Sequence, residues 1–296
     1  MLLSRLHPGS FWRGLRHELV CSPSKPIIRR GGEHASTFRT SKYLHSLPLH
    51  RTMATYRKIN NPQGLILVYA EPGPNVPEDE FHDWYVNEHI PPRLVVPGLL
   101  TCSRYKAADS QSPSWLALYD ITSPSVTQTP EYLSLGPSAS AREKRIMRDL
   151  AHINRRVYEH VVSFVHPNTL PSQLPGRFVF IVHMTVTLEG EEEFNRWYNE
   201  EHMVLLSKIP GWLRGRRYKL IESVSRGVKS EPKDEEKPTM DYLAIHELEM
   251  DGFMGLPEFK DAIQTPWRER VMKTVMDWEL RLFEQHAVFK RELAKF

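Results

Sequence analysis

Apolar residues gather in short runs separated by polar, acidic or Pro-Gly segments, and the same succession of runs occurs twice along the chain. Short apolar runs flanked by turn residues are typical of buried strands. Segments with an acidic start, such as 77–80, are typical of helices because acidic side chains favour the positive N-terminal end. In each copy the predicted order is strand, helix, strand, strand, helix, strand: 65–71, about 78–90, 99–107, 115–122, 138–155 and 157–165, then 178–187, about 189–208, 212–222, 241–249, 257–277 and 281–289.

The repetition is visible in the residues themselves. The segment Phe81-His82-Asp83-Trp84-Tyr85-Val86-Asn87-Glu88-His89 returns 113 positions later as Phe194-Asn195-Arg196-Trp197-Tyr198-Asn199-Glu200-Glu201-His202. The apolar run Leu65–Ala70 matches Phe178–His183 at the same offset. A later block, Trp115–Ile121, matches Tyr242–Leu248 with 14 further residues inserted, and the charged segment 225–237 accounts for them as a surface loop.

This order of elements predicts two copies of the split βαβ, ferredoxin-like unit, which has a four-stranded antiparallel sheet and two helices on one face. The other sheet face must be covered, and the second copy in the same chain is the obvious cover. We therefore predict an α+β protein in which two tandem ferredoxin-like units pack their sheets into an intramolecular, dimeric-type α+β barrel. The predicted domains are 53–168 and 169–296, after an N-terminal extension of residues 1–52.

The net charge of +3 hides a basic N-terminus, where residues 1–52 hold nine Lys or Arg against two acids. Frequent Arg and Ser with few acids suit a mitochondrial transit peptide. A disordered tail, or translation that starts at Met53, would explain the segment equally well. The expected location is cytoplasmic if Met53 is the start, and mitochondrial if residues 1–52 are a targeting segment.

Several protein classes are excluded by what the sequence contains. Two cysteines are too few for a disulfide scaffold or a four-cysteine metal site, and no apolar run reaches the length of a membrane span. The body of the chain is mildly acidic, so no nucleic-acid partner is expected. It has no glycine-rich phosphate loop or dinucleotide fingerprint, so nucleotide cofactors are not expected.

The motif Phe-x-x-Trp-Tyr-x-x-Glu-His, followed by Pro-Gly, resembles the EthD-domain family of the dimeric α+β barrel superfamily. The resemblance covers both copies, roughly residues 62–166 and 176–290. It implies a small-molecule pocket in each half of the barrel. The superfamily includes cofactor-free isomerases, polyketide cyclases, decarboxylases and oxygenases, and some members bind haem.

The first helix of each copy carries the candidate catalytic residues. Tyr85 and His89 lie four residues apart on one helix face, and Tyr198 and His202 repeat this spacing. A neutral imidazole can accept a proton near pH 7, as a general base must, although a structural histidine that bonds a strand carbonyl fits the pattern equally well. The tyrosines could donate a hydrogen bond to a developing enolate oxygen, or simply pack with the hydroxyl at a rim.

The strands supply candidate substrate-binding residues. Strand alternation and the neighbouring positions of the first and third strands lead us to expect that His183 and His246 converge on the barrel cavity, where the first copy has Ala70 and Tyr119. Together with His202 they would make the second half the better candidate for chemistry. A metal site at these histidines, or edge histidines facing solvent, are the alternatives.

Arg104 and Arg217 precede tyrosines on the second strands. Each could hold a substrate carboxylate or phenolate by a forked contact, although solvated edge arginines are common.

These residues favour an enzyme of small-molecule or secondary metabolism that transfers a proton without a cofactor, on an apolar substrate that is aromatic or polyketide-like. Decarboxylation, dehydration, isomerisation and cofactor-free oxygenation share that step, so lyase, isomerase and oxygenase chemistry all remain open. One alternative is an oxidoreductase, or its accessory, that uses haem or a metal. Another is a non-catalytic binder of apolar ligands. The expected state is a monomeric pseudo-dimer or a homodimer.

Overall fold

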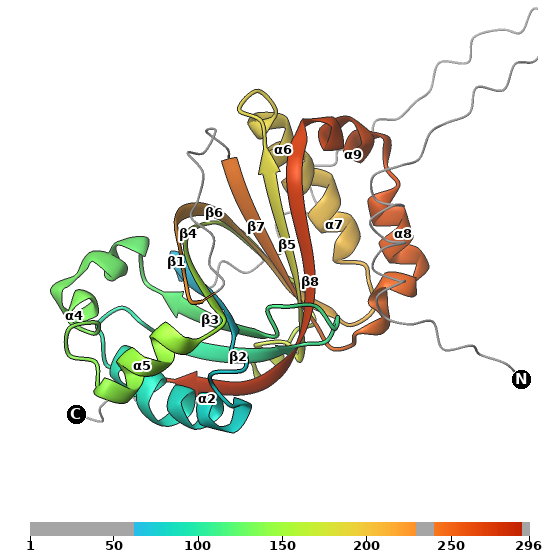
Figure 1. The fold of residues 1–296 in the computed structure, drawn as a ribbon. Helices are drawn as coiled ribbons and strands as arrows, with labels where there is room; N and C mark the ends of the chain where they lie inside the picture. Colours follow the sequence, from blue (N-terminus) through green and yellow to red (C-terminus); the bar gives the residue numbers. More distant parts are fainter. Residues whose placement is uncertain (1–61, 229–239, 292–296) are drawn as a thin grey trace, which may run out of the picture. The chain divides into compact units, whose positions relative to one another are not determined.

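The computed structural model describes residues 62–228 and 240–291, whose strands form one closed barrel (Figure 1). The strand order is β1-β3-β2-β8-β5-β7-β6-β4, with antiparallel neighbours throughout. The strands are β1 (Gly64–Glu71), β2 (Thr101–Ala107), β3 (Trp115–Ile121), β4 (His152–Val165), β5 (Phe178–Val186), β6 (Trp212–Arg226), β7 (Met240–Leu248) and β8 (Val275–Lys290).

Helices follow β1 and β3 in the first unit and β5 and β7 in the second. The first unit has α2 (Glu78–Trp84), a π-helical turn η3 (Tyr85–His89), α3 (Ile90–Leu94), η4 (Pro124–Gln128), α4 (Pro130–Leu133) and α5 (Ala141–Asp149). A short 3-10 turn, η5 (Pro171–Gln173), connects the units. The second unit has α6 (Glu191–Trp197), a π-helical turn η6 (Tyr198–His202), α7 (Met203–Leu206), η7 (Gly252–Gly255), α8 (Pro257–Ile263), α9 (Pro266–Val271) and η8 (Met272–Thr274).

The predicted fold class is confirmed: the protein is α+β, and two βαββαβ units form one eight-stranded antiparallel barrel. Two pairings join the units, β2 with β8 and β4 with β6. The boundary at 168/169 stays a prediction, because the described residues belong to one compact unit. The extension 1–52 lies outside the described residues. Within them no helix is long and apolar enough to cross a membrane.

The two faces of the barrel wall bury different sets of side chains. The interior is filled by large apolar and tyrosine side chains from both units: Leu65, Leu67, Tyr69, Tyr105, Leu116, Leu118, Tyr158, Val179, Ile181, Tyr218, Leu243, Ile245 and Phe283. In the first unit the outer face packs under the helices, with Trp84 and Phe81 among the most deeply buried side chains. The barrel interior is thus a packed core, and space for a ligand has to be sought between sheet and helices.

Several element boundaries differ from the sequence prediction. The second helix ends at Asp149 rather than 155, and β4 begins at His152 rather than 157. In the second unit β8 begins at Val275, inside the segment predicted as a helix. β6 continues to Arg226, so the first part of the predicted 225–237 loop is strand, and residues 229–237 lie outside the described residues. Pairing between the units, which a local pattern does not contain, lengthens β4 and β6, as in Ile153 with Arg226. The early start of β8 comes from its pairing with β5 of the same unit, Val275 with Val186.

The helix after β1 does not stop at Pro91-Pro92 as predicted. The π-helical turn Tyr85–His89 comes first, and α3 then begins at Ile90 with both prolines in its first turn. His89 and Ile90 have helical dihedral angles, so the chain stays helical into the prolines, whose fixed φ suits a helix. Their missing N–H groups leave carbonyls of the preceding π-helical turn without these intrahelical donors. A pair of prolines that normally ends a helix therefore starts a new segment.

One buried ion pair connects the two units. Asp109, in the loop after β2, accepts hydrogen bonds from Arg281 Nε on β8 at 2.9 Å and from the backbone N–H of Leu282 at 3.0 Å. The same guanidinium donates from Nη2 to the carbonyl oxygens of Gln111 and Pro113, both at 2.9 Å. Both charged side chains are almost fully shielded from solvent.

Replacing Asp109 by Asn should lower the free energy of unfolding by about 3–5 kcal/mol, because it leaves a buried guanidinium without its counter-charge. Urea unfolding followed by circular dichroism measures this directly. Asp79 is exposed at the start of α2, and Asp79→Asn is the matched control, expected to change stability by less than about 0.5 kcal/mol. Equal effects of the two substitutions on stability would contradict a stabilising role of the buried Asp109–Arg281 ion pair.

Candidate functional site

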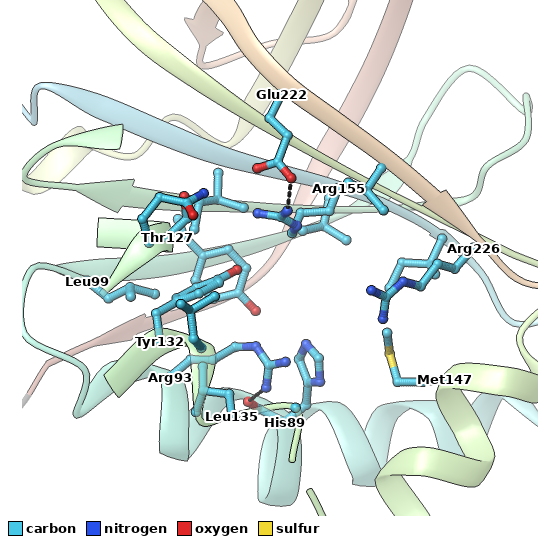
Figure 2. A pocket seen from close by; sticks show the side chains of 18 residues that line it. His89, Arg93, Leu99, Thr127, Tyr132, Leu135, Met147, Arg155, Glu222 and Arg226 are labelled. Carbon is cyan, nitrogen blue, oxygen red and sulfur yellow. Dashed lines mark hydrogen bonds and ion pairs between the residues drawn. The ribbon is translucent and has the colours of Figure 1, made fainter. Parts of the chain in front are cut away.

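A cavity of about 360 Å³ lies between the outer face of the sheet and the helices of the first unit (Figure 2). Its walls come from β1, β3 and β4, from the helical segments between 89 and 147, and from the end of β6 in the second unit. The lining residues are Ile66, Val68, His89, Arg93, Leu99, Tyr119, Thr127, Gln128, Tyr132, Leu133, Leu135, Gly136, Met147, Ile153, Arg155, Glu222, Val224 and Arg226. The volume is in the range that accommodates one small organic molecule.

The π-helical turn Tyr85–His89 places His89 in this cavity. Its wider turn replaces the ordinary α-helical spacing assumed from the sequence, and it holds Tyr85 and His89 with ring centroids 4.8 Å apart. The second unit has the same π-helical turn at Tyr198–His202. Such single π-turns inside α-helices are frequent at functional sites.

Glu143 of α5 fixes the orientation of the His89 ring. Its Oε1 lies 2.9 Å from His89 Nδ1, and its Oε2 accepts a hydrogen bond of 2.6 Å from the Trp84 indole N–H. Arg93 adds a hydrogen bond of 2.6 Å from Nη1 to the His89 carbonyl and lies 3.5 Å from Glu143 Oε1. His89 is 4% exposed and Glu143 is 8% exposed, so this pair is almost entirely desolvated.

The charge states of this pair follow from its surroundings. Burial, with a smaller effect of the Arg93 charge, lowers the pKa of His89 to about 4, so the ring is neutral at pH 7. The pKa of Glu143 is lowered to about 2, because the hydrogen bond and charge of His89, with Arg93 and Trp84, outweigh the burial that would raise it. An ionised carboxylate only accepts, so Nδ1 must carry the proton and donate it to Glu143. Nε2 then has a free lone pair, which is the form required of a general base.

Two further predicted residues lie beside His89. Tyr119 lines the cavity, and its hydroxyl donates to the Tyr85 hydroxyl over 3.4 Å. Burial raises the pKa of Tyr85 to about 12, so its phenol is protonated, and the side chain is buried rather than at a rim. Arg104 lies behind it, with its guanidinium 4.2 Å from the centre of the Tyr85 ring and Nη2 donating to His82. Arg104 is buried and is not among the residues that line the cavity.

The equivalent place in the second unit has a different chemistry. Thr265 caps α9 as Ser140 caps α5, and the residue three positions on is Arg268 in place of Glu143. His202 Nδ1 therefore donates to the Ala262 carbonyl over 3.1 Å instead of to a carboxylate. Burial, with smaller effects of neighbouring positive groups that include Arg268, holds the pKa of His202 well below its usual value.

His246 has both ring nitrogens occupied. The Trp212 indole N–H, which can only donate, lies 3.3 Å from Nδ1, so Nε2 carries the proton and donates to the Tyr198 hydroxyl over 3.2 Å. Arg217 stacks on the Tyr198 ring at 4.4 Å and donates to Asn195 and Asn199. Both Tyr198 and Arg217 are therefore committed to protein partners.

The expected convergence of His183 and His246 is wrong. The β5–β7 register pairs His183 with Leu243 and Phe180 with His246, so the two histidines lie on opposite faces of the sheet. His183 belongs to the interior face with Ile181, whereas His246 faces the helices.

The internal alignment of the first strands also needs a correction. Ile66 pairs with Tyr119, and Phe180 pairs with His246, the counterpart of Tyr119. The first strands therefore correspond at an offset of 114 rather than 113, and His183 is the counterpart of Tyr69 rather than of Ala70. A slip of one residue moves every side chain to the other face of a sheet.

Large aromatic side chains occupy the second unit where the first has its cavity. The cavity-lining Ile66 corresponds to Phe180, whose ring packs against Phe253 at 5.3 Å and Phe259 at 6.4 Å between centroids. The geometry thus favours the first unit as the candidate site, whereas the sequence had favoured the second. The roles of the predicted residues stay predictions.

The sequence analysis missed Glu143, Arg93, Arg155 and Glu222. Glu143 follows Ser140 by three positions, a spacing typical of a helix N-terminal capping box, so the sequence offers a sufficient structural explanation for it. The sequence signal that could have singled out Glu143 is that Arg268 occupies the equivalent position in the second copy. In the described part of the chain, no group of three or more His, Cys, Asp or Glu side chains is arranged to hold a metal ion.

No family model matches the chain, and no curated protein matches it. Among solved structures, an anthrone oxidase-like protein aligns with a TM-score of 0.53 and 12% identity, over 79% of this chain and 95% of that chain. The chain has the dimeric α+β barrel fold. A monooxygenase-like protein from Listeria innocua aligns with a TM-score of 0.40 and 12% identity, over 76% of this chain and 96% of that chain. A heme-degrading enzyme from Listeria monocytogenes aligns with a TM-score of 0.38 and 9% identity, over 74% of this chain and 98% of that chain. At these identities the likeness shows the fold alone.

Three buried histidines, His89, His202 and His246, and the partly buried His183 should make the protein sensitive to mild acid. Burial lowers the pKa of His89 and of His183 to about 4, that of His246 to about 3, and holds that of His202 well below its usual value. The unfolded chain takes up these protons near pH 6.5, so the free energy of unfolding should fall between about pH 6.5 and 4, by up to ~1.4 kcal/mol per pH unit for each histidine.

Urea unfolding at pH 7.5, 6.5, 5.5 and 5.0 measures this loss. His202→Gln removes one titrating group and should make the pH dependence shallower by about one proton. A stability that stays constant down to pH 5 would show that the histidines are not buried in their neutral form.

Proposed function

We propose that the protein is a small-molecule enzyme in which His89 removes an acidic proton from an apolar, aromatic or polyketide-like substrate without the help of a cofactor. The observation that carries the proposal is the buried, neutral His89 whose Nδ1–H donates to the ionised Glu143 inside a cavity. In the reaction a substrate C–H or O–H bond breaks, the proton passes to Nε2, and the electron pair moves onto a substrate oxygen. Glu143 stabilises the imidazolium that forms.

The surroundings of His89 suit that step. The apolar walls of the cavity, among them Ile66, Val68 and Met147, exclude water from the reacting atoms. The guanidinium of Arg93 is the group in the lining that would stabilise a developing oxyanion. The Tyr119 hydroxyl would add a second donor by turning its single proton from Tyr85 to the substrate. Tyr85 supports Tyr119 from behind rather than contacting the substrate.

Membership of the EthD-domain family is part of the same proposal. The repeated Phe-x-x-Trp-Tyr-x-x-Glu-His segment supports it, since in both copies that segment forms the π-helical turn at the site. The solved anthrone oxidase-like structure is compatible with the proposed substrate class, because an anthrone is an aromatic ketone with an acidic C–H group. Lyase, isomerase and oxygenase reactions all remain consistent with a first proton abstraction.

An oxidoreductase that binds haem or a metal is the second candidate. The same hydrogen bond from His89 to Glu143 favours this candidate, because a histidine that ligates a metal through one ring nitrogen commonly donates its other N–H to a carboxylate. His89 Nε2 would be the ligand. An absorbance spectrum of protein from a native-like host tests this: a Soret band that is lost in His89→Gln would favour this candidate over the cofactor-free one.

The test of the leading proposal is hydrogen–deuterium exchange of acidic C–H groups in D₂O, followed by NMR over a panel of aromatic ketones and β-keto acids. His89→Gln should lower the enzyme-catalysed exchange rate by roughly 10²–10⁴-fold, since a general base contributes about that much. Glu143→Gln should also lower the rate, by up to about 10⁴-fold. Its one amide oxygen cannot accept from both the Trp84 N–H and His89 Nδ1–H, and an amide N–H that faces Nδ1 would leave the ring proton on Nε2.

His202→Gln is the matched control in the second unit and should leave the exchange rate within about twofold of the wild type. The opposite pattern, with loss in His202→Gln only, would place the base in the second unit. Binding of panel compounds without any exchange above the uncatalysed rate would favour a non-catalytic carrier.

A further inference from the structure

The cavity of the first unit contains more positive than negative charge. Its lining includes three guanidiniums, Arg93, Arg155 and Arg226, and one carboxylate, Glu222. Figure 2 shows Arg93 beside His89 on the helix side, with Arg155, Glu222 and Arg226 across from them on the strands.

Arg93 and Arg155 each have one carboxylate partner. Arg93 contacts Glu143 and the His89 carbonyl, as described above. Arg155 donates from Nη2 to Glu222 Oε1 over 2.8 Å. Among the described residues Arg226 has no carboxylate within ion-pair distance, but its side chain is exposed, so water screens this charge at the edge of the cavity.

Arg155 Nη1 is the atom from which we infer a ligand. It is buried from solvent and has no hydrogen-bond partner within the described part of the chain. A buried N–H that lacks an acceptor is costly, and a guanidinium offers its donors as a fork that matches a carboxylate. Because Nη1 is closed even to a water-sized molecule, a ligand oxygen in the cavity completes this fork only when the guanidinium turns toward it.

The second unit shows that the fold does not require this charge. The β1–β4 register sets Arg155 opposite Val68, and the β5–β8 register sets Leu280 opposite the equivalent Val182. Arg93 corresponds in the same way to Leu206, at the offset of 113 that relates the two helices. Arg93 and Arg155 of the first-unit cavity are therefore leucines in the copy that packs its equivalent space with aromatic rings.

From these observations we infer that the ligand of the cavity is an aromatic or polyketide-like anion, whose carboxylate or other acidic oxygen is bound by Arg155 Nη1. The inference rests on the proposed function for the position of the reacting group, and it adds that the substrate is an anion. Arg155 then acts in substrate binding and selectivity, whereas His89 moves the proton.

The experiment compares two probes of nearly equal size and shape, 1-naphthoate and the uncharged 1-naphthamide, by calorimetric titration of the full chain at low ionic strength. The wild type should bind the anion at least tenfold more tightly than the amide, as expected for a charge-assisted hydrogen bond. Arg155→Leu should remove this preference and leave the affinity for the amide within about twofold. Arg155→Lys keeps the charge without the fork and should retain part of the preference.

Arg177→Leu is the matched control. Arg177 also pairs with a glutamate, Glu284 at 2.8 Å, but on an exposed edge away from the cavity lining. This variant should bind both probes as the wild type does. Equal affinity of the wild type for the two probes, no binding of either, or equal weakening of both by Arg155→Leu would overturn the inference.

The proposed function and this inference can fail separately. His89→Gln should still prefer the naphthoate, because the preference comes from Arg155. If the wild type prefers the anion but exchanges no substrate proton, the anion site is supported and His89 is rejected as the base. Proton exchange without a preference for the anion would support His89 as the base and reject the anion site.

Discussion

The structure depends on the pairing of sheet edges between the two units. A four-stranded sheet leaves two edges with unpaired backbone groups, and β2–β8 and β4–β6 pairing removes all four. The β4–β6 ladder runs almost the full length of both strands and carries β6 past its own unit to Arg226. Glu222 and Arg226 thereby reach a cavity whose histidine belongs to the other unit. The candidate site is a consequence of barrel closure and would not be complete in an isolated unit.

The low pKa of His89 has a direct bearing on the proposed chemistry. Burial and the Arg93 charge keep the ring neutral, and a base with a pKa of about 4 is weak at neutral pH. An anion bound in the same cavity would favour the imidazolium over the neutral ring and so raise the pKa of His89 toward the working pH. Basicity would then appear only when the ligand is present. The excess of arginines and the depressed pKa of the histidine are in this way parts of one electrostatic arrangement.

Sequence reasoning was sufficient for the order of strands and helices and for the barrel, because apolar runs, Pro-Gly turns and the repeat are local signals. It could not fix faces and registers. The run around His183 is apolar on both sides, so nothing in it distinguishes an offset of 113 from one of 114, and the wrong choice brought His183 and His246 together. Glu143 was missed for a related reason: its contact with His89 spans 54 positions, and its place behind Ser140 already had a structural explanation.

Two units within one chain can change independently, which two identical subunits cannot. A change from glutamate to arginine at the position of Glu143 and Arg268 would alter both sites of a homodimer, but here it affects one unit only. The second unit has a guanidinium near His202 and phenylalanines around Phe180, yet it still supplies β6 and β8 to close the barrel. Its stability therefore need not be limited by a desolvated His–Glu pair and an open cavity. The proposed chemistry accordingly belongs to the first unit, and the second unit is the scaffold that completes the wall of its cavity.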